Sequence, residues 1–249
     1  ANAIFADAPG CDHDLLVDCG GESAVNFVVK PFLRAQGVNR LANLALTHGD
    51  HRRVGGFARL AAEFRPALTC ISPARARSPA YRAALTQLEA TPGRSRTISA
   101  GDQLAGWEVL HPAADDKFDR ADDQALILRG EFHGLRVLLL SELGAAGQRA
   151  LLARGGDLRA DLVIAAMPEQ GEPLSDALLA AIRPQLIVLA DTEFPASKRP
   201  KPALLTRLPR TGVPVLRLTE TGSLTARFNQ RGVTITTVED REVASLSPP

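Results

Sequence analysis

The sequence predicts an α/β fold in which one domain, residues 1–249, contains two similar halves, with their sheets packed together and their helices outside. Short apolar runs alternate along the chain with stretches of helical periodicity. The chain has 249 residues and 45% hydrophobic content, enough for a sizeable core. Its formal net charge is only +1, so binding to nucleic acid or to a membrane would have to come from a local basic patch.

In the first half, apolar runs bounded by turn-forming residues predict strands, and periodic runs predict helices. A turn at Pro9 and Gly10 joins the first two strands. Gly37 ends the first helix, and Pro31 inside it should kink the helix or mark its true start. Ser78 and Pro79 suit the N-cap and first position of a later helix. The strands are expected at 3–8, 14–20, 41–49 and 67–72, and the helices at 24–37, 57–64 and 78–90.

The second half begins with residues whose alternation predicts an antiparallel meander, 96–112 and 123–143, with a tight turn near His133 and Gly134. Alternating helices and strands follow. The helices are expected at 145–155, 175–184 and 203–209, and the strands at 160–168, 185–191, 213–228 and 232–238. The tail, 244–249, is expected to fray.

Several function classes lack their signatures. No Gly-x-x-x-x-Gly-Lys loop is present, so no nucleotide cofactor is expected, and no Gly-x-Ser-x-Gly elbow supports a serine hydrolase. The three cysteines form no Cys-x-x-Cys pair. Cys11 and Cys19 could face each other across a hairpin, but a bridge between them would need an oxidising compartment. No run approaches the ~20 apolar residues of a membrane-spanning helix.

The segment "ALTHGDHRRVGG", residues 45–56, raises the question of a metal. His48 lies at the end of a predicted buried strand, where α/β sheets usually carry their chemistry. Two histidines and an acid within four positions favour a cation, whereas Arg52 and Arg53 have no lone pair to donate. The other histidines, His13, His111 and His133, are expected at turns or strand ends on the surface.

The order of the elements and five motifs resemble the metallo-β-lactamase superfamily, and more closely the C-terminal domain of the ComEC/Rec2 family of DNA-uptake proteins. The motifs are "DLLVDCGG", "VVKPFLRAQGVNRLANLALTHGD", "GWEVLHP", "DDQALILRGEFHGLRVLLLSEL", and "DLVIAAMPEQGEP" with "LLAAIRPQLIVLAD". The resemblance implies a four-layer αββα sandwich with two metal ions at one edge of the sheets. It also implies a metal-dependent phosphodiesterase that degrades the DNA strand not carried across the membrane.

Compared with the family pattern, His48 and Asp50 keep two ligand positions, and Arg52 and Arg53 replace the ligands of the second metal. Asp18 matches a structural aspartate expected to support the His48 loop by hydrogen bonds. Glu142 takes the place of the aspartate that bridges the metals. No family histidine remains in the two later ligand stretches, which carry Glu169 in the first and Lys198, Arg199 and Lys201 in the second.

Two interpretations follow. In the first, one cation is held by four residues, and the guanidinium of Arg52 supplies the charge of the missing metal. Such an oxygen-rich set suits manganese or magnesium better than zinc, and its Asp50 and Glu142 would be the catalytic carboxylates. In the second, which we favour over a working hydrolase, Arg52 and Arg53 form salt bridges with the acids and no metal binds. The four residues are His48, Asp50, Glu142 and Glu169.

A basic segment from 197 to 210 is the best candidate for contact with a phosphate backbone, and residues 75–82 could add to it. The aromatic content of 4% favours backbone contact with single-stranded DNA over base stacking. An ordinary solvated loop is the alternative. The contact residues expected in the segment are Lys198, Arg199, Lys201 and Arg207.

Three functions follow from this reading. The first is a DNA-handling module, inactive or weakly active as a nuclease. The second is a one-metal phosphodiesterase, and the third is a structural scaffold. We expect the chain to be a fragment of a larger membrane protein, joined to an N-terminal channel portion of the same polypeptide and lying on the extracytoplasmic side.

Overall fold

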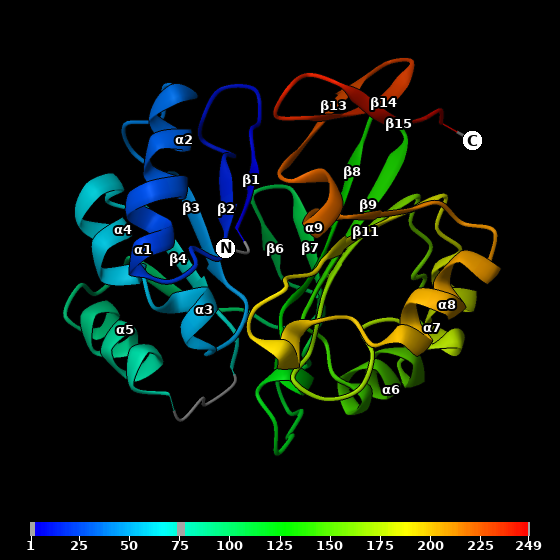
Figure 1. Cartoon of the computed structure of the whole chain (residues 1–249). Coiled ribbons are helices and arrows are strands. Elements are labelled where there is room, and N and C mark those ends of the chain that lie inside the picture. Colours follow the sequence, from blue (N-terminus) through cyan, green and yellow to red (C-terminus); the bar gives the residue numbers. More distant parts are fainter. Residues whose placement is uncertain (1–2, 74–77, 249) are drawn as a thin grey trace. The chain divides into compact units, whose positions relative to one another are not determined.

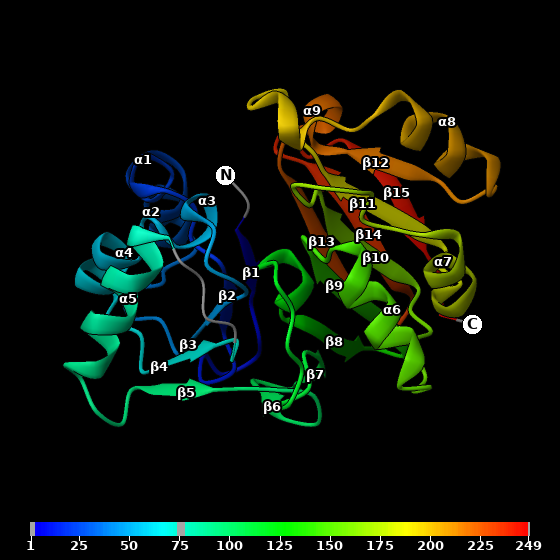
Figure 2. The same ribbon diagram turned by 90° about the horizontal axis from the view of Figure 1, so that it is seen from below.

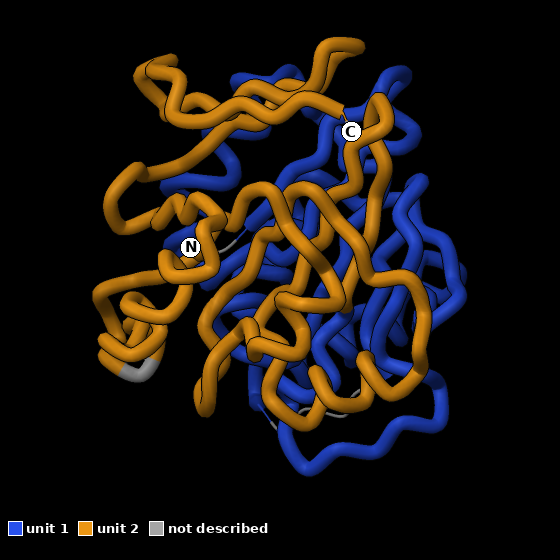
Figure 3. The backbone as a smooth tube through the Cα atoms, turned by 90° about the vertical axis from the view of Figure 1, so that its right-hand side faces the viewer, with its two compact units in different colours: residues 1–126 blue, residues 127–249 orange. Residues whose placement is uncertain are grey.

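The computed structural model describes residues 3–73 and 78–248, and the chain divides into two compact units. Unit 1 is residues 1–126 and unit 2 is residues 127–249 (Figure 3). Each unit contains its own sheet with helices beside it, so the predicted α/β class is confirmed in both. That the two units form a single domain stays a prediction.

Unit 1 has a five-stranded sheet in which β1 is antiparallel to β2 and the remaining neighbours are parallel. The strands follow the chain order: β1 (Ile4–Ala6), β2 (Leu15–Val17), β3 (Asn43–Leu46), β4 (Leu68–Ile71) and β5 (Ser95–Thr97). The sequence placed 96–97 in an antiparallel meander, which is wrong, because β5 adds to this sheet parallel to β4. Within 96–112, β6 (Gln103–Leu104) and β7 (Trp107–His111) form the expected antiparallel hairpin.

The helices of unit 1 lie on one face of this sheet (Figures 1 and 2). They include α3 (His51–Val54), α4 (Phe57–Phe64) and α5 (Pro79–Glu89). Ser78 caps α5 by accepting a hydrogen bond from the Tyr81 N–H, as the sequence predicted. A short 3₁₀ turn, η2 (Asp122–Gln124), ends the unit.

The first helix runs from α1 (Glu22–Ala24) through a π-helical segment, η1 (Val25–Val29), into α2 (Lys30–Ala35). Pro31 therefore neither starts nor ends the helix. Proline has no backbone N–H to donate to the carbonyl four residues earlier, and a wider π turn next to it accommodates that loss. The helix stops before Gly37, whose φ of +78° is readily available only to glycine.

The core of unit 1 lies between this sheet face and the helices. Leu16, Leu44 and Leu46 from the strands form one buried cluster with residues from the helices. Each fully buried side chain of this size contributes roughly 1.5–3 kcal/mol. The cluster fixes the carboxyl ends of β2 and β3, from which the candidate site residues follow. The helical members include Val25, Leu33, Phe57, Leu60, Phe64 and Tyr81.

Unit 2 contains a mixed sheet with helices α6 (Ala145–Ala153), α7 (Asp176–Ile182) and α8 (Pro202–Arg210) on one side (Figure 1). A tight turn at His133 and Gly134, both with positive φ, joins the antiparallel pair β8 and β9 as predicted. The strand order is β12 (Val215–Arg217), β11 (Leu186–Ala190), β10 (Leu162–Ala166), β9 (Leu135–Ser141) and β8 (Ile127–Phe132). Within this sheet, β9 and β10, β10 and β11, and β11 and β12 pair in parallel.

A three-stranded antiparallel sheet completes unit 2, formed by β13 (Leu224–Asn229), β14 (Gly232–Thr237) and β15 (Glu242–Leu246). The predicted fraying from 244 is wrong for 244–246, because β15 pairs with β14 along these residues. Two short helical turns, η3 (Ala196–Lys198) and α9 (Leu218–Thr221), lie in the connections. Within 3–73 and 78–248, no helix is both long and apolar enough to cross a bilayer.

Candidate metal centre and basic segment

His48 sits in the loop between β3 and α3, and Asp18 holds this loop in place. Asp18 follows β2, which is hydrogen-bonded to β3, and has a left-handed φ of +59°. Its Oδ1 accepts the Thr47 N–H at 2.8 Å, and its Oδ2 accepts the Thr47 hydroxyl at 2.9 Å. These are the supporting hydrogen bonds that the sequence predicted for Asp18, although its role beside a metal stays a prediction.

The same hydrogen bonds fix the tautomer of His48. The Thr47 hydroxyl has one proton, which it donates to Asp18, so it must accept from the imidazole Nδ1 that lies 3.1 Å away. A neutral His48 then carries its lone pair on Nε2. That atom lies 3.6 Å from Oδ1 of Asp122. Two electron-rich atoms at this separation suit a shared cation, or a proton on Nε2.

Asp122 is a functional candidate that the sequence reasoning missed. It belongs to η2, and hydrogen bonds tie this turn and the residues that follow it to the rest of unit 1. His111 Nε2 lies 2.7 Å from the Asp123 carbonyl, Ser72 donates to the Gln124 carbonyl, and the Leu126 N–H donates to the Thr47 carbonyl. His111 is fully buried, which corrects the expected surface placement.

Asp50 acts as the N-cap of α3. Its Oδ1 accepts the Arg52 N–H at 2.7 Å, and its Oδ2 lies 3.4 Å from the Arg52 guanidinium. An acid at this position stabilises the first turn of a helix. The predicted pairing of Arg52 with Asp50 is therefore present, and Arg52 stays partly exposed.

Arg53 has a partner that the sequence did not suggest. Its guanidinium is buried and contacts Oδ2 of Asp18 at 3.0 Å, whereas the predicted partners were Asp50, Glu142 and Glu169. Burial raises the pKa of the Asp18 carboxyl, and the positive charge of Arg53 and the hydrogen bonds from Thr47 oppose that rise. The Arg53–Asp18 ion pair thus stabilises the charged form of Asp18 in the interior of unit 1.

The cysteines do not form the bridge considered from the sequence. All three are free thiols, with Cys11 exposed and Cys19 and Cys70 buried. The Cys19 thiol donates to the Arg53 carbonyl at 3.3 Å, and burial raises its pKa, so it stays protonated near neutral pH.

In unit 2, Glu142 directly follows β9 and pairs with Lys198 of η3. Lys198 Nζ lies 2.5 Å from Oε2 of Glu142, and only 3% and 2% of the two residues is exposed. Lys198 was predicted to contact DNA, and the structure corrects this, because its ammonium is inside the unit and bonded to a carboxylate. Glu169 lies in the exposed loop after β10.

The described residues can therefore be tested against the two-metal centre that the resemblance implies. The carboxylates at two predicted ligand positions are each bonded to a cationic side chain of the same unit, Asp50 to Arg52 and Glu142 to Lys198, and the structural Asp18 is bonded to Arg53. Cationic side chains bonded to these carboxylates repel a metal ion, so two metals do not fit this donor set. The pair His48 Nε2 and Asp122 Oδ1 fits a single divalent ion. That Asp50, Glu142 or Glu169 joins His48 in such a site stays a prediction.

The predicted basic segment is only partly available to a phosphate backbone. Arg199 is exposed, although its guanidinium also donates to the Glu193 carbonyl at 2.9 Å, and Lys201 is exposed at the N-terminus of α8. Of the second basic stretch, Arg75 and Arg77 lie outside the described residues.

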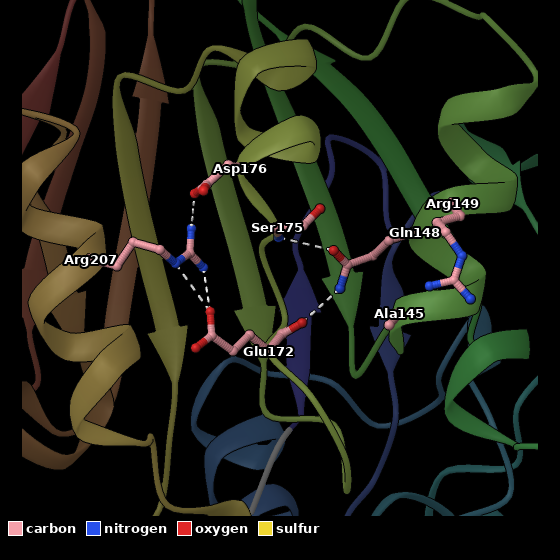
Figure 4. A pocket seen from close by; sticks show the side chains of 7 residues that line it. All are labelled: Ala145, Gln148, Arg149, Glu172, Ser175, Asp176 and Arg207. Carbon is pink, nitrogen blue, oxygen red and sulfur yellow. Dashed lines mark hydrogen bonds and ion pairs between the residues drawn. The ribbon is translucent and has the colours of Figure 1, made fainter.

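Arg207 points into a pocket of about 310 Å³ in unit 2 (Figure 4). Its guanidinium bonds the carboxylates of Glu172, at 2.6 Å, and Asp176, at 2.5 Å. The predicted DNA contact of Arg207 is corrected, since these bonds occupy its donors.

Buried Gln148 joins the other side of the same pocket. Its amide donates to the carbonyls of Leu143 and Glu172 and accepts the Ser175 N–H. These interactions connect α6, α7 and α8, so we interpret the pocket as a structural contact between packed helices and not as a ligand site.

Comparison with known proteins supports the resemblance found in the sequence. No family model matches the chain. It is 26% identical over 225 residues to competence protein ComA of Neisseria gonorrhoeae, covering 89% of this chain and 30% of that protein. It is 21% identical over 249 residues to ComE operon protein 3 of Bacillus subtilis (strain 168), covering 92% and 32%. The chain thus spans about a third of the length of these relatives.

Solved structures resemble the chain at lower similarity. A putative metal-dependent hydrolase from Parabacteroides distasonis has a TM-score of 0.48 and 12% identity, covering 86% of this chain and 88% of that one. The Rm3 metallo-β-lactamase has a TM-score of 0.43 and 16% identity, covering 67% and 72%.

Proposed function

We propose that this chain is a DNA-handling module of a DNA-uptake protein, one that holds DNA and does not cut it by a two-metal mechanism. The observation that carries the proposal is the similarity to a competence protein over nine-tenths of the chain. The paired cations refine it. Two-metal hydrolysis needs carboxylates that hold the ions which stabilise the attacking and leaving oxygens, and here the carboxylates at two ligand positions, Asp50 and Glu142, are bonded to Arg52 and Lys198.

The exposed cations Arg199 and Lys201 are the proposed contacts to DNA. Both lie at the N-terminal approach to α8, where backbone N–H groups also favour an anion. Contacts of this kind read the phosphate backbone and carry no base sequence. The proposed partner is therefore single-stranded DNA of any sequence.

A second candidate function, a one-metal phosphodiesterase, rests on the His48 and Asp122 pair. A single manganese or magnesium ion there would supply a Lewis acid for a phosphoryl oxygen. Asp18 and Thr47 would keep the imidazole in the tautomer that can bind the ion. A scaffold without DNA binding is the third function.

The setting is also part of the proposal. Since the relatives are about three times as long, we place the chain in a longer polypeptide with a membrane channel portion, on the extracytoplasmic side.

DNA binding separates the module from the scaffold. Fluorescence anisotropy with labelled single-stranded DNA, repeated over a range of salt concentrations, should show binding that weakens with salt. In Arg199→Ala/Lys201→Ala, the plot of log association constant against log salt concentration should become less steep. The magnitude of its negative slope should decrease by about 1.4, since each lost contact to a single strand removes about 0.7.

The matched control is Arg231→Ala/Arg241→Ala, which removes the same charge from exposed positions of the β13 to β15 sheet. An equal loss of binding in this control would mean that the overall charge of the chain attracts DNA, and not the specific positions of Arg199 and Lys201. If the unaltered chain does not bind DNA, the DNA-handling proposal is refuted and the scaffold function is favoured.

Metal analysis tests the enzyme reading. After dialysis against manganese, magnesium or zinc, we expect at most one ion per chain and no rapid cleavage of single-stranded DNA. His48→Ala and Asp122→Asn should each abolish any bound ion. Two ions per chain with cleavage would refute the proposal, whereas one ion with cleavage that is lost in both variants would establish the phosphodiesterase.

A further inference from the structure

The first helix of unit 1 has an apolar face on its solvent side. Phe27, Val28 and Phe32 are 79%, 52% and 45% exposed, and Pro31 beside them is also exposed. Val28 and Phe32 are four residues apart, as are Phe27 and Pro31, so the four side chains form one strip along the helix. The opposite face, with Val25, Val29 and Leu33, fills the core. A helix with a second apolar face in solvent marks an interaction surface.

Basic side chains flank this strip. Lys30 and Arg34 come from the same helix and Arg59 comes from α4, where its Nε donates to Asn26 at 3.0 Å. All three contact one carboxylate, that of Glu63, at 2.8 Å from Lys30, 3.0 Å from Arg59 and 3.9 Å from Arg34. Three cations sharing one anion leave an excess of two positive charges beside the apolar strip. Each of the three is at least a third exposed.

We propose that this face, which we call the docking face (Phe27, Val28, Pro31 and Phe32 with Lys30, Arg34 and Arg59), binds an anionic lipid surface. The partner must be apolar along the strip and anionic along its edge. The boundary between headgroups and acyl chains offers both within ~5–10 Å, and helices that lie in this boundary have the same composition. The inference goes beyond the DNA-handling function and does not depend on it.

Two physical effects determine the expected affinity for anionic vesicles. Burying one Phe side chain favours the bound state by roughly tenfold or more. Each basic residue near an anionic surface adds about fivefold, and salt removes this part. Binding should therefore require both the apolar strip and the anionic lipid.

The experiment is vesicle co-sedimentation of the whole chain with phosphatidylcholine alone and with phosphatidylcholine containing 30% phosphatidylserine. We expect binding to the anionic vesicles, at least tenfold weaker binding to the neutral ones, and weakening with salt. Phe27→Ser/Val28→Ser should reduce the binding to anionic vesicles at least tenfold. This variant keeps Phe32, which packs against Phe5 with ring centroids 6.2 Å apart, so the fold is spared.

Two controls isolate the docking face. Phe194→Ser removes an even more exposed aromatic side chain, 87% exposed, from unit 2 and should leave vesicle binding unchanged. Arg199→Ala/Lys201→Ala should also leave it unchanged, which separates lipid binding from the proposed DNA binding.

A second readout does not depend on affinity. In Phe27→Trp, the new indole should shift its emission to shorter wavelength on anionic vesicles and be quenched by brominated lipid. The native Trp107 is buried and should contribute no shift. No sedimentation with either vesicle, binding that survives Phe27→Ser/Val28→Ser, or concentration-dependent dimerisation abolished by that variant would each overturn the proposal.

Discussion

The β3 loop of unit 1 and the Glu142 site of unit 2 deal with buried acidic groups in different ways. Around His48, Asp18 still supports the loop through Thr47, and Asp122 faces the imidazole, so two metal donors survive. Around Glu142, the carboxylate is bonded directly to the ammonium of Lys198. The difference teaches that a cationic side chain can stabilise a buried carboxylate locally, without any ion. Two substitutions test how far each region depends on its internal cation, and one titration tests the core beneath the β3 loop.

The largest effect is expected at Glu142. Lys198→Met removes the ammonium that is bonded to the buried Glu142 carboxylate, which should lower the free energy of unfolding by about 3–5 kcal/mol. Guanidinium unfolding followed by far-UV circular dichroism measures it. Adding Glu142→Gln to Lys198→Met should recover most of the loss, because the buried charge is then gone. An unchanged midpoint in Lys198→Met would mean that the pair contributes nothing.

A smaller loss is expected at Asp18. Arg53→Met removes one of its partners but keeps both hydrogen bonds from Thr47, so the cost should be about 2–3 kcal/mol. Trp107 is the single tryptophan and lies in unit 1, so its fluorescence follows this unit. The neighbouring Arg52→Met is the control and should cost no more than about 0.5 kcal/mol, because Arg52 is partly exposed. Equal costs would contradict the assignment of Arg53 to Asp18.

The last effect is absent at neutral pH and concerns the core on which the β3 loop rests. Burial raises the pKa of Tyr81 to about 12, so the folded chain keeps this proton at pH values where the unfolded chain loses it. The unfolded state then binds fewer protons, and stability falls by about 1.4 kcal/mol per pH unit as the pH rises from about 10 to 12. Tyr81 is the only tyrosine, so absorbance at 295 nm reports it alone. Ionisation of the folded chain with a midpoint near 10 would show that the ring is solvated.

Much of the fold was predictable because local rules decide it. Ser78 and Pro79 start α5, Gly37 ends the first helix, and the residues His133 and Gly134 make the turn between β8 and β9. Each depends on backbone conformations or hydrogen bonds within a few residues. The pairing of β5 was not predictable in this way, because a short strand alternates in the same manner in either sheet direction.

The candidate site was predictable only as a set of residue types. The sequence indicated that His48 sits at a strand end, that Asp18 supports it and that two arginines stand among the ligands. It gave no signal that Asp122 would face the imidazole, apart from two adjacent acids before a strand.

By itself, the sequence determined that the chain alternates strands and helices, that it resembles competence proteins, and that fixed cations stand where a second metal would need ligands. Only the tertiary structure decided which acid each cation meets. Arg53 and Asp18 are 35 positions apart and Lys198 and Glu142 are 56 apart. Contacts at such separations depend on how strands are ordered in a sheet and on which side chains are excluded from water, and neither is set by neighbours along the chain.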